Sequence, residues 1–184
     1  TYAIDDSIYL TELITFGDTI ILPETPTKEG YTFKGWSEIP ETMPAEDITI
    51  IGSFAINTYA ITYIVNGEIF ATDSLSYSSE IILPEYPQKE GHSFGWRLED
   101  GRSVPKTMPA KNLTITGTFT TNSYWITYYV DDKFYCDTQR TYGKDISLVE
   151  EPEKEGYTFS GWKIEGFDEI PETMPAQDLK IIGY

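Results

Sequence analysis

Apolar and polar residues alternate with a period of two along most of the chain. Residues 59–65 read Tyr-Ala-Ile-Thr-Tyr-Ile-Val, and a second extended stretch of this kind covers residues 69–77. Asn66-Gly67 lies between them, and this dipeptide is a strong signal for a two-residue type I′ turn. The pattern therefore predicts a β-hairpin.

Three more extended segments follow the first hairpin of the chain, and all of them are rich in β-branched and aromatic residues. They cover residues 20–22, which Pro23 and Pro26 interrupt, residues 31–36 and residues 48–54. Nowhere do ten residues show the i, i+3, i+4 apolar stripe of an amphipathic helix. We therefore predict a mainly β protein, α+β at most, with no more than a helical turn.

One sequence motif occurs three times in the chain. KEGYTFKGW at 28–36 is repeated as KEGHSFGW at 89–96 and as KEGYTFSGW at 154–162, and MPA follows at 43, 108 and 174. Aligning the Thr-Tyr pairs that begin at 1, 62 and 127 predicts three copies, 1–61, 62–126 and 127–184. A motif that recurs at this period is explained first by tandem structural units, and only after that by a catalytic role. Copies one and three start and stop in mid-pattern, so we expect a piece of a longer array.

The repeated motif combines a turn with aromatic residues. The Gly of each KEG is expected to supply a positive φ angle, and the Gly before each Trp leaves room for the indole or for a bulge. A unit of about 60 residues is marginally stable, and one aromatic ring buries roughly 150 to 250 Å². We therefore expect aromatic anchors in the core of each copy, namely Tyr31, Phe33, Trp36, Phe94, Trp96, Tyr157, Phe159 and Trp162. The three Trp are expected to be buried at equivalent positions.

Composition and charge exclude several classes of protein. Apolar residues make up 40% and aromatic residues 15% of the chain, which is too many for a disordered segment. The net charge of −17 repels phosphate backbones and anionic lipids, so we expect no nucleic acid partner. No run approaches the roughly 18 to 20 apolar residues of a spanning helix, so we expect no membrane insertion. The copies carry net charges of −8, −2 and −7.

Residues that could carry chemistry are few. His92 is the only histidine and stands where the other copies have Tyr, and Cys136, the only cysteine, stands on a strand as a small core residue. The paired Asp at 5–6 and 131–132 match no calcium loop, and no phosphate-binding Gly-rich motif is present. We therefore expect no enzyme, no catalytic residue, no metal and no cofactor.

Trp125 stands where copy two has Ala60, beside Tyr124 and Tyr129. With Tyr124 and Tyr129 it could form a platform on which a sugar stacks. The alternative is packing at the junction between copies two and three. The sequence leaves both interpretations open.

The whole pattern resembles the Listeria-Bacteroides repeat, also called the internalin B repeat. The resemblance rests on KEGYTF-x-GW, on MPAEDITIIGSF at 43–54 and on the hairpin with its Asp or Asn turn, and it covers the chain three times. It implies tandem β-grasp, ubiquitin-like units in secreted or cell-wall-attached bacterial proteins. Copy two departs from it, because it lacks the residue between Phe94 and Gly95.

The resemblance implies a non-enzymatic extracellular stalk or spacer, or part of a surface adhesin, and it carries no catalytic residues over. The alternative is a module that binds a host-surface protein or a glycan. The links at 55–58 and 120–123 contain neither Gly nor Pro, so they cannot act as flexible coils. We therefore predict an elongated, monomeric array with restricted bending.

Overall fold

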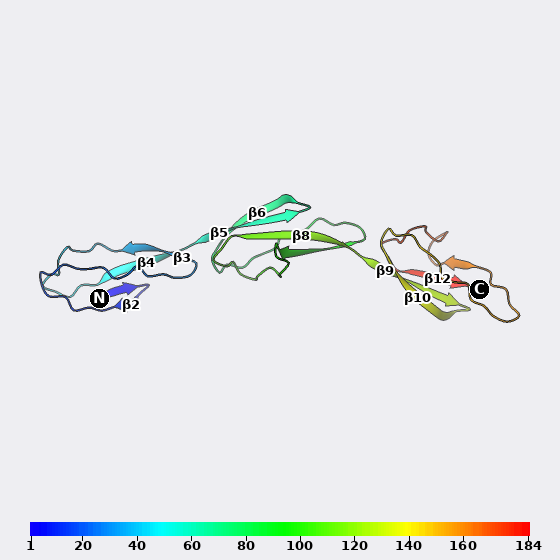
Figure 1. Cartoon of the computed structure of the whole chain (residues 1–184), viewed down its shortest axis with the longest axis horizontal. Helices are drawn as coiled ribbons and strands as arrows, with labels where there is room; N and C mark the ends of the chain where they lie inside the picture. The colour runs from blue at the N-terminus through cyan, green and yellow to red at the C-terminus, as the bar shows by residue number, and fades with distance from the viewer. The chain divides into compact units, whose positions relative to one another are not determined.

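The computed structural model describes residues 1–184 as twelve β-strands without a helix (Figure 1). The strands are β1 (Tyr2–Ile4), β2 (Ser7–Leu10), β3 (Tyr31–Trp36), β4 (Ile50–Ile56), β5 (Thr58–Val65), β6 (Glu68–Ser76), β7 (His92–Leu98), β8 (Leu113–Thr121), β9 (Ser123–Val130), β10 (Lys133–Thr141), β11 (Trp162–Ile164) and β12 (Leu179–Gly183). The predicted mainly β class is confirmed.

The strands form three four-stranded sheets with one topology. Their orders are β2-β1-β4-β3, β6-β5-β8-β7 and β10-β9-β12-β11. In the first and third sheets, the two central strands run parallel and each outer strand is antiparallel to its neighbour. The tandem repetition of one mixed sheet is therefore confirmed, while the β-grasp assignment stays an expectation from the resemblance.

Each sheet begins with the predicted hairpin. Asn66 and Gly67 have φ angles of 53° and 82°, and both signs are those of a type I′ turn. The equivalent Asp pairs, Asp5-Asp6 and Asp131-Asp132, adopt the same positive φ region, which Asp tolerates better than most residues. The KEG glycines also have positive φ, as predicted, at Gly30, Gly91 and Gly156.

The strand predicted at residues 20–22 is wrong. Thr19 forms only an isolated bridge with Thr42, and the two later copies repeat this single bridge. A proline has no N–H to donate to a ladder, and one follows this segment in every copy, at Pro26, Pro87 and Pro152. The strand predicted at 31–36 is present with the same bounds, and the one predicted at 48–54 is observed two residues later, as β4.

The core lies on one face of each sheet. In the third sheet, Ile126 and Tyr128 of β9 alternate with less buried residues, and Leu179 and Ile181 of β12 do the same. Met174 of the MPA motif completes this core. The second sheet buries the equivalent residues Ile61, Tyr63, Met108, Leu113 and Ile115. The sequence marked MPA as a repeat but did not identify its Met as core.

The first core is the smallest of the three. Tyr2 and Ile50 are buried, with 2% and 3% of their surfaces exposed. Met43 and Ile48, by contrast, are only half-buried, although Met108 and Leu113 are buried at the same positions of the second copy. The first repeat therefore excludes less apolar surface from water than the other two.

The expectation that the three Trp are buried is wrong, because all three are half-buried. Each belongs to the outermost strand of its sheet, β3, β7 or β11, where one side of the strand has no neighbour. The indoles of Trp36 and Trp162 instead meet the rings of the buried Tyr2 and Tyr128 edge-on, at 5.2 and 5.1 Å between centroids. They cover the core from its edge.

Contacts divide the chain into two compact units. The first consists of residues 1–84 and 97–116, and it contains the whole first sheet. The second consists of residues 85–96 and 117–184, and it contains the whole third sheet. The copy boundaries drawn from the sequence at 61/62 and 126/127 fall within β5 and β9.

Candidate interaction surfaces

Trp125 and Tyr129 lie on the outer face of the third sheet. On β9, the side chain of Trp125 is 46% exposed and that of Tyr129 is half-buried. Both alternate along the strand with the buried Ile126 and Tyr128. Tyr129 meets the ring of Phe134 edge-on at 6.2 Å, and Lys180 Nζ lies 5.4 Å from its centroid. This face is therefore aromatic and partly exposed.

Tyr124 does not belong to that face. It is half-buried and packs against the third core, because neighbouring residues of a strand point to opposite sides. Trp125 and Tyr129 themselves are four residues apart, about 13 Å along a strand, and Thr127 lies between them. The structure thus separates the three residues that the sequence grouped as a binding platform.

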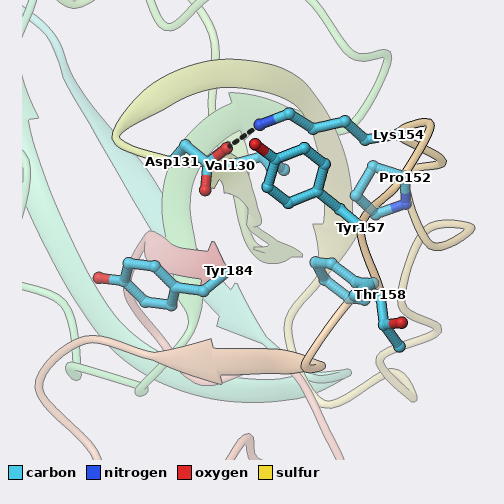
Figure 2. Close-up of a pocket in the computed structure, with 8 residues that line it drawn as sticks. Val130, Asp131, Pro152, Lys154, Tyr157, Thr158 and Tyr184 are labelled. Carbon is cyan, nitrogen blue, oxygen red and sulfur yellow. Dashed lines mark hydrogen bonds and ion pairs between the residues drawn. The ribbon is translucent and has the colours of Figure 1, made fainter.

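Each KEG Lys of copies one and three pairs with an Asp of the hairpin turn. Lys154 Nζ lies 3.0 Å from Asp131 Oδ2 and 4.3 Å from the centroid of Tyr157. Figure 2 shows this Lys reaching past the Tyr157 ring to Asp131, at a cavity of about 70 Å³ that Pro152 and Tyr184 also line. Lys28, Asp5 and Tyr31 repeat the arrangement in copy one, with an ion pair of 3.4 Å.

This pair is a surface feature. The side chains of Lys154 and Asp131 are 58% and 53% exposed, and exposed ion pairs contribute about 0 to 1 kcal/mol to stability. The second copy has Asn66 at the Asp position. The ion pair orients the hairpin turn. The cavity beside it is too small for a substrate, because ligand pockets have volumes of about 300 to 1,000 Å³.

The single His and the single Cys of the chain both pack against neighbouring side chains. His92 lies between the rings of Phe119 and Tyr142, at 6.3 and 5.9 Å, as expected for a residue that replaces Tyr. Cys136 is partly buried against the third core. Burial raises the pKa of its thiol, and the nearby Asp137 carboxylate raises it further. A raised pKa lowers the thiolate fraction, so Cys136 is a poor nucleophile.

No three His, Cys, Asp or Glu side chains come together in a group that could hold a metal ion. No helix long and apolar enough to cross a bilayer is present either.

A contact between repeats is the feature that sequence reasoning missed. Within the first unit, a single residue, Asn57, separates β4 from β5. Its N–H donates to the Gly30 carbonyl at 2.9 Å, and its carbonyl accepts from the Tyr77 N–H at 2.8 Å. Tyr77 belongs to copy two, and its ring lies on Gly30 and edge-on to Tyr31 of copy one, 6.0 Å away. We call this arrangement the junction.

The second unit contains the same junction between copies two and three. Asn122 takes the place of Asn57, with hydrogen bonds of 2.8 Å to Gly91 and 2.9 Å from Tyr142. The ring of Tyr142 lies on Gly91 and edge-on to His92. Both glycines are buried. The junction is thus a regular part of the repeat structure, because it is formed both between copies one and two and between copies two and three.

A fixed pattern in the sequence marks the junction. Asn is followed two residues later by Tyr at 57–59 and 122–124, and an aromatic residue occupies the same position of each copy, as Phe16, Tyr77 and Tyr142. Sequence reasoning assigned the KEG rings to their own copies. It could not tell that the Gly before them receives a ring from the next copy.

The structural anchors fall into two groups. Phe33, Phe94 and Phe159 meet their Trp edge-on at 5.1, 4.9 and 4.9 Å, beside Gly52, Gly117 and Gly183, where any Cβ would collide with these rings. Tyr31 instead contacts the junction. Tyr157 differs from the expectation of a core anchor, because it is 73% exposed.

The fold, the repeated turns and the junction describe a tandem β-repeat protein. The family model of the Listeria-Bacteroides repeat domain matches residues 1–51, 59–120 and 124–180. The chain belongs to this family, in three copies.

Similar curated proteins include an internalin and two proteins that are named as membrane proteins. Internalin H of Listeria monocytogenes is 37% identical over 116 residues, which cover 54% of this chain and 21% of that protein. Two proteins of Evansella cellulosilytica, a putative membrane protein and a putative Gly-rich membrane protein, are each 29% identical over 80% of this chain. The chain spans only about a fifth to a quarter of the length of these relatives.

Proposed function

We propose that the chain is a non-enzymatic, extracellular repeat array that serves as a stalk or spacer, or as part of an adhesin, in a secreted or cell-wall-attached bacterial protein. The family and the internalin relative support a surface protein built from repeats. No cofactor takes part in this function, and the chain acts as a monomer.

The junction is the observation that carries the proposal. A spacer needs resistance to bending, and neighbouring copies here are joined by one residue that is hydrogen-bonded on both sides. A ring of the next copy also covers the KEG glycine. Such a link lacks the freedom of a Gly/Ser coil. The net charge of −17 adds repulsion between copies, although salt screens it beyond about 8 Å.

Small-angle X-ray scattering of the dilute monomer tests the stalk. A single compact domain of 184 residues has a radius of gyration of about 16 Å. We expect a value well above this, with a long-tailed distance distribution. A variant with a Gly/Ser insertion after Asn57 is the control, and it should broaden that distribution. A parent value near 16 Å would show that the copies share one core and would refute the array.

The exposed Trp125 supports a second candidate, a module that binds a glycan or a host-surface protein. Trp125 is 46% exposed on a face that also carries Tyr129, and Trp and Tyr are enriched among the residues that dominate binding interfaces. Tyr124 contributes only indirectly, through the core beneath.

A glycan array and a thermal-shift screen separate the two candidates. A binding module gives a saturable signal that Trp125→Ala abolishes and that Tyr184→Ala, another exposed aromatic change, leaves intact. The stalk gives no signal in either variant or in the parent.

A further inference from the structure

We propose that the third repeat is a force-bearing module, in which the two central strands β9 and β12 together resist tension along the chain. The proposal deepens the stalk function, on which its biological use rests, because a spacer that connects two attached parts is pulled from both sides. The first repeat has the same parallel pairing, between β1 and β4.

The chain passes into and out of the third sheet through two neighbouring parallel strands. β9 begins at Ser123 and β12 ends at Gly183, and the two strands pair in parallel from Ile126 with Leu179 to Val130 with Gly183. Because both strands run in the same direction, the start of β9 and the end of β12 lie at opposite ends of the pair. Tension on these two points therefore pulls the strands lengthwise past each other.

The direction of pulling decides how the hydrogen bonds between two strands share the force. When the open ends of an antiparallel hairpin such as β9 and β10 are pulled apart, its residue pairs separate one after another. When β9 and β12 are pulled lengthwise, all the bonds between them carry the force and must break together. Forced rupture is governed by the rate of unfolding, so lengthwise pulling meets the higher barrier.

A side-chain hydrogen bond extends this pair of strands at the point where force reaches β9. The Trp125 N–H donates to Asp178 Oδ1 at 2.8 Å, and these residues directly precede the paired Ile126 and Leu179. Copy two repeats the bond within the first unit, where the Ala60 N–H donates to Asn112 Oδ1 at 2.9 Å. Asp178 therefore fastens β9 to β12 one residue before the strand ladder begins.

The core shields the β9–β12 pair on one face. Ile126, Tyr128, Leu179 and Ile181 come from these two strands, and each is at most 3% exposed. β10 and β11 flank the pair on its two sides. Hydrogen bonds are stronger in such a low-dielectric environment than in water, so water gives little help in separating these strands.

Single-molecule force spectroscopy of the whole chain tests the proposal with two pairs of attachment points. Ser123→Cys with Tyr184→Cys pulls β9 and β12 lengthwise, whereas Ser123→Cys with Gln139→Cys opens the β9–β10 hairpin near its free end. All three positions are exposed. Both proteins also carry Cys136→Ala, because copy two has Ala71 at that position. At one loading rate, we expect the lengthwise pair to rupture at a several-fold higher force.

Asp178→Ala separates the bond to Trp125 from general stability. It should lower the rupture force in the lengthwise direction and leave the force that opens the hairpin unchanged. Asp168→Ala, which removes another exposed carboxylate, is the matched control and should rupture like the parent in both directions.

Equal rupture forces for the two pairs of attachment points would overturn the proposal. An equal loss in both directions for Asp178→Ala would overturn the role of that bond, because it would show a general loss of stability. These outcomes are independent of the scattering experiment. A chain that scatters as an extended array but ruptures at equal forces keeps the stalk function and loses the force-bearing one.

The opposite result, a compact chain with direction-dependent rupture, would refute the stalk and keep the mechanical property of the repeat.

Discussion

Three tyrosines occupy the centre of the three sheets. Tyr2, Tyr63 and Tyr128 are at most 2% exposed, and burial is the main cause that raises the pKa of each. The nearby carboxylates of Glu12 and Asp73 raise the pKa of Tyr2 and Tyr63 further. A ring this large fills a small core, and its hydroxyl makes that core sensitive to alkali.

We expect Tyr128→Phe to protect the third repeat from alkaline unfolding. Because the folded pKa lies above the unfolded value of about 10, the native state holds a proton that the unfolded chain releases in that window. The stabilisation is complete below about pH 10 and is lost as the pH rises through the folded pKa. Melting temperatures from pH 8 to 11 should fall less steeply for Tyr128→Phe. Tyr184→Phe, at an exposed position, should follow the parent; equal slopes for all three proteins would contradict the assignment.

At the scale of elements, the junction links a turn of one repeat to a strand end of the next. Its parts are modest singly: a backbone hydrogen bond contributes about 1 kcal/mol, and an aromatic pair about 0.5 to 1.5 kcal/mol. Together they couple the stabilities of neighbouring repeats, as the interfaces of other repeat proteins do.

Gly91→Ala and Gly156→Ala measure the junction directly. Both changes place a Cβ at a positive φ, which costs roughly 1 kcal/mol or more. Only Gly91 also has the Tyr142 ring on its Cα, whereas Gly156 is open. We expect Gly91→Ala to lower the free energy of unfolding by at least 1 kcal/mol more than Gly156→Ala does, in denaturant titrations followed by fluorescence. Equal losses would mean that the ring contact contributes nothing.

At the scale of the whole molecule, the free energy of unfolding is distributed over three repeats whose cores differ in burial. Met43 and Ile48 of the first repeat are only half-buried, whereas Met108 and Leu113 are buried at the same positions of the second, so we expect the first repeat to be the least stable of the three. Neighbouring repeats are linked by a junction within each unit, and stability in tandem-repeat proteins is approximately a sum of repeat and interface contributions. Unfolding of the chain is therefore expected to proceed in steps.

Trp36→Ala should unfold the first repeat and leave the others nearly intact. Truncating a fully buried Trp costs about 3 to 5 kcal/mol, and the half-buried Trp36 should cost less. A unit of about 60 residues has little stability to spare. Amide hydrogen exchange should show loss of protection in β1 to β4 and its retention in β9 to β12. A variant that melts like the parent would refute the role of Trp36, and loss of all protection at once would refute stepwise unfolding.

Local signals made much of the fold predictable. The hairpins follow from alternating residues around Asn66-Gly67 and the Asp pairs, and β3 has the predicted bounds, 31–36. The failure at residues 20–22 has a local signal as well, because Pro26 and its equivalents Pro87 and Pro152 follow the apolar run in every copy and cannot donate to a ladder. For the candidate surfaces, the sequence named Trp125 and Tyr129 but grouped them with Tyr124, which faces the core.

The sequence by itself determined the repeat, its hairpins and its positive-φ turns, because these depend on residue type and on the period of two within a few neighbouring residues. Only the tertiary structure decided what covers them. Gly30 and Gly91 are buried under a ring of the next copy, and nothing within the KEG motif itself contains that ring. The three Trp are half-buried because their strands lie at the sheet edge. Burial depends on residues brought from elsewhere in the chain, and no short motif contains that information.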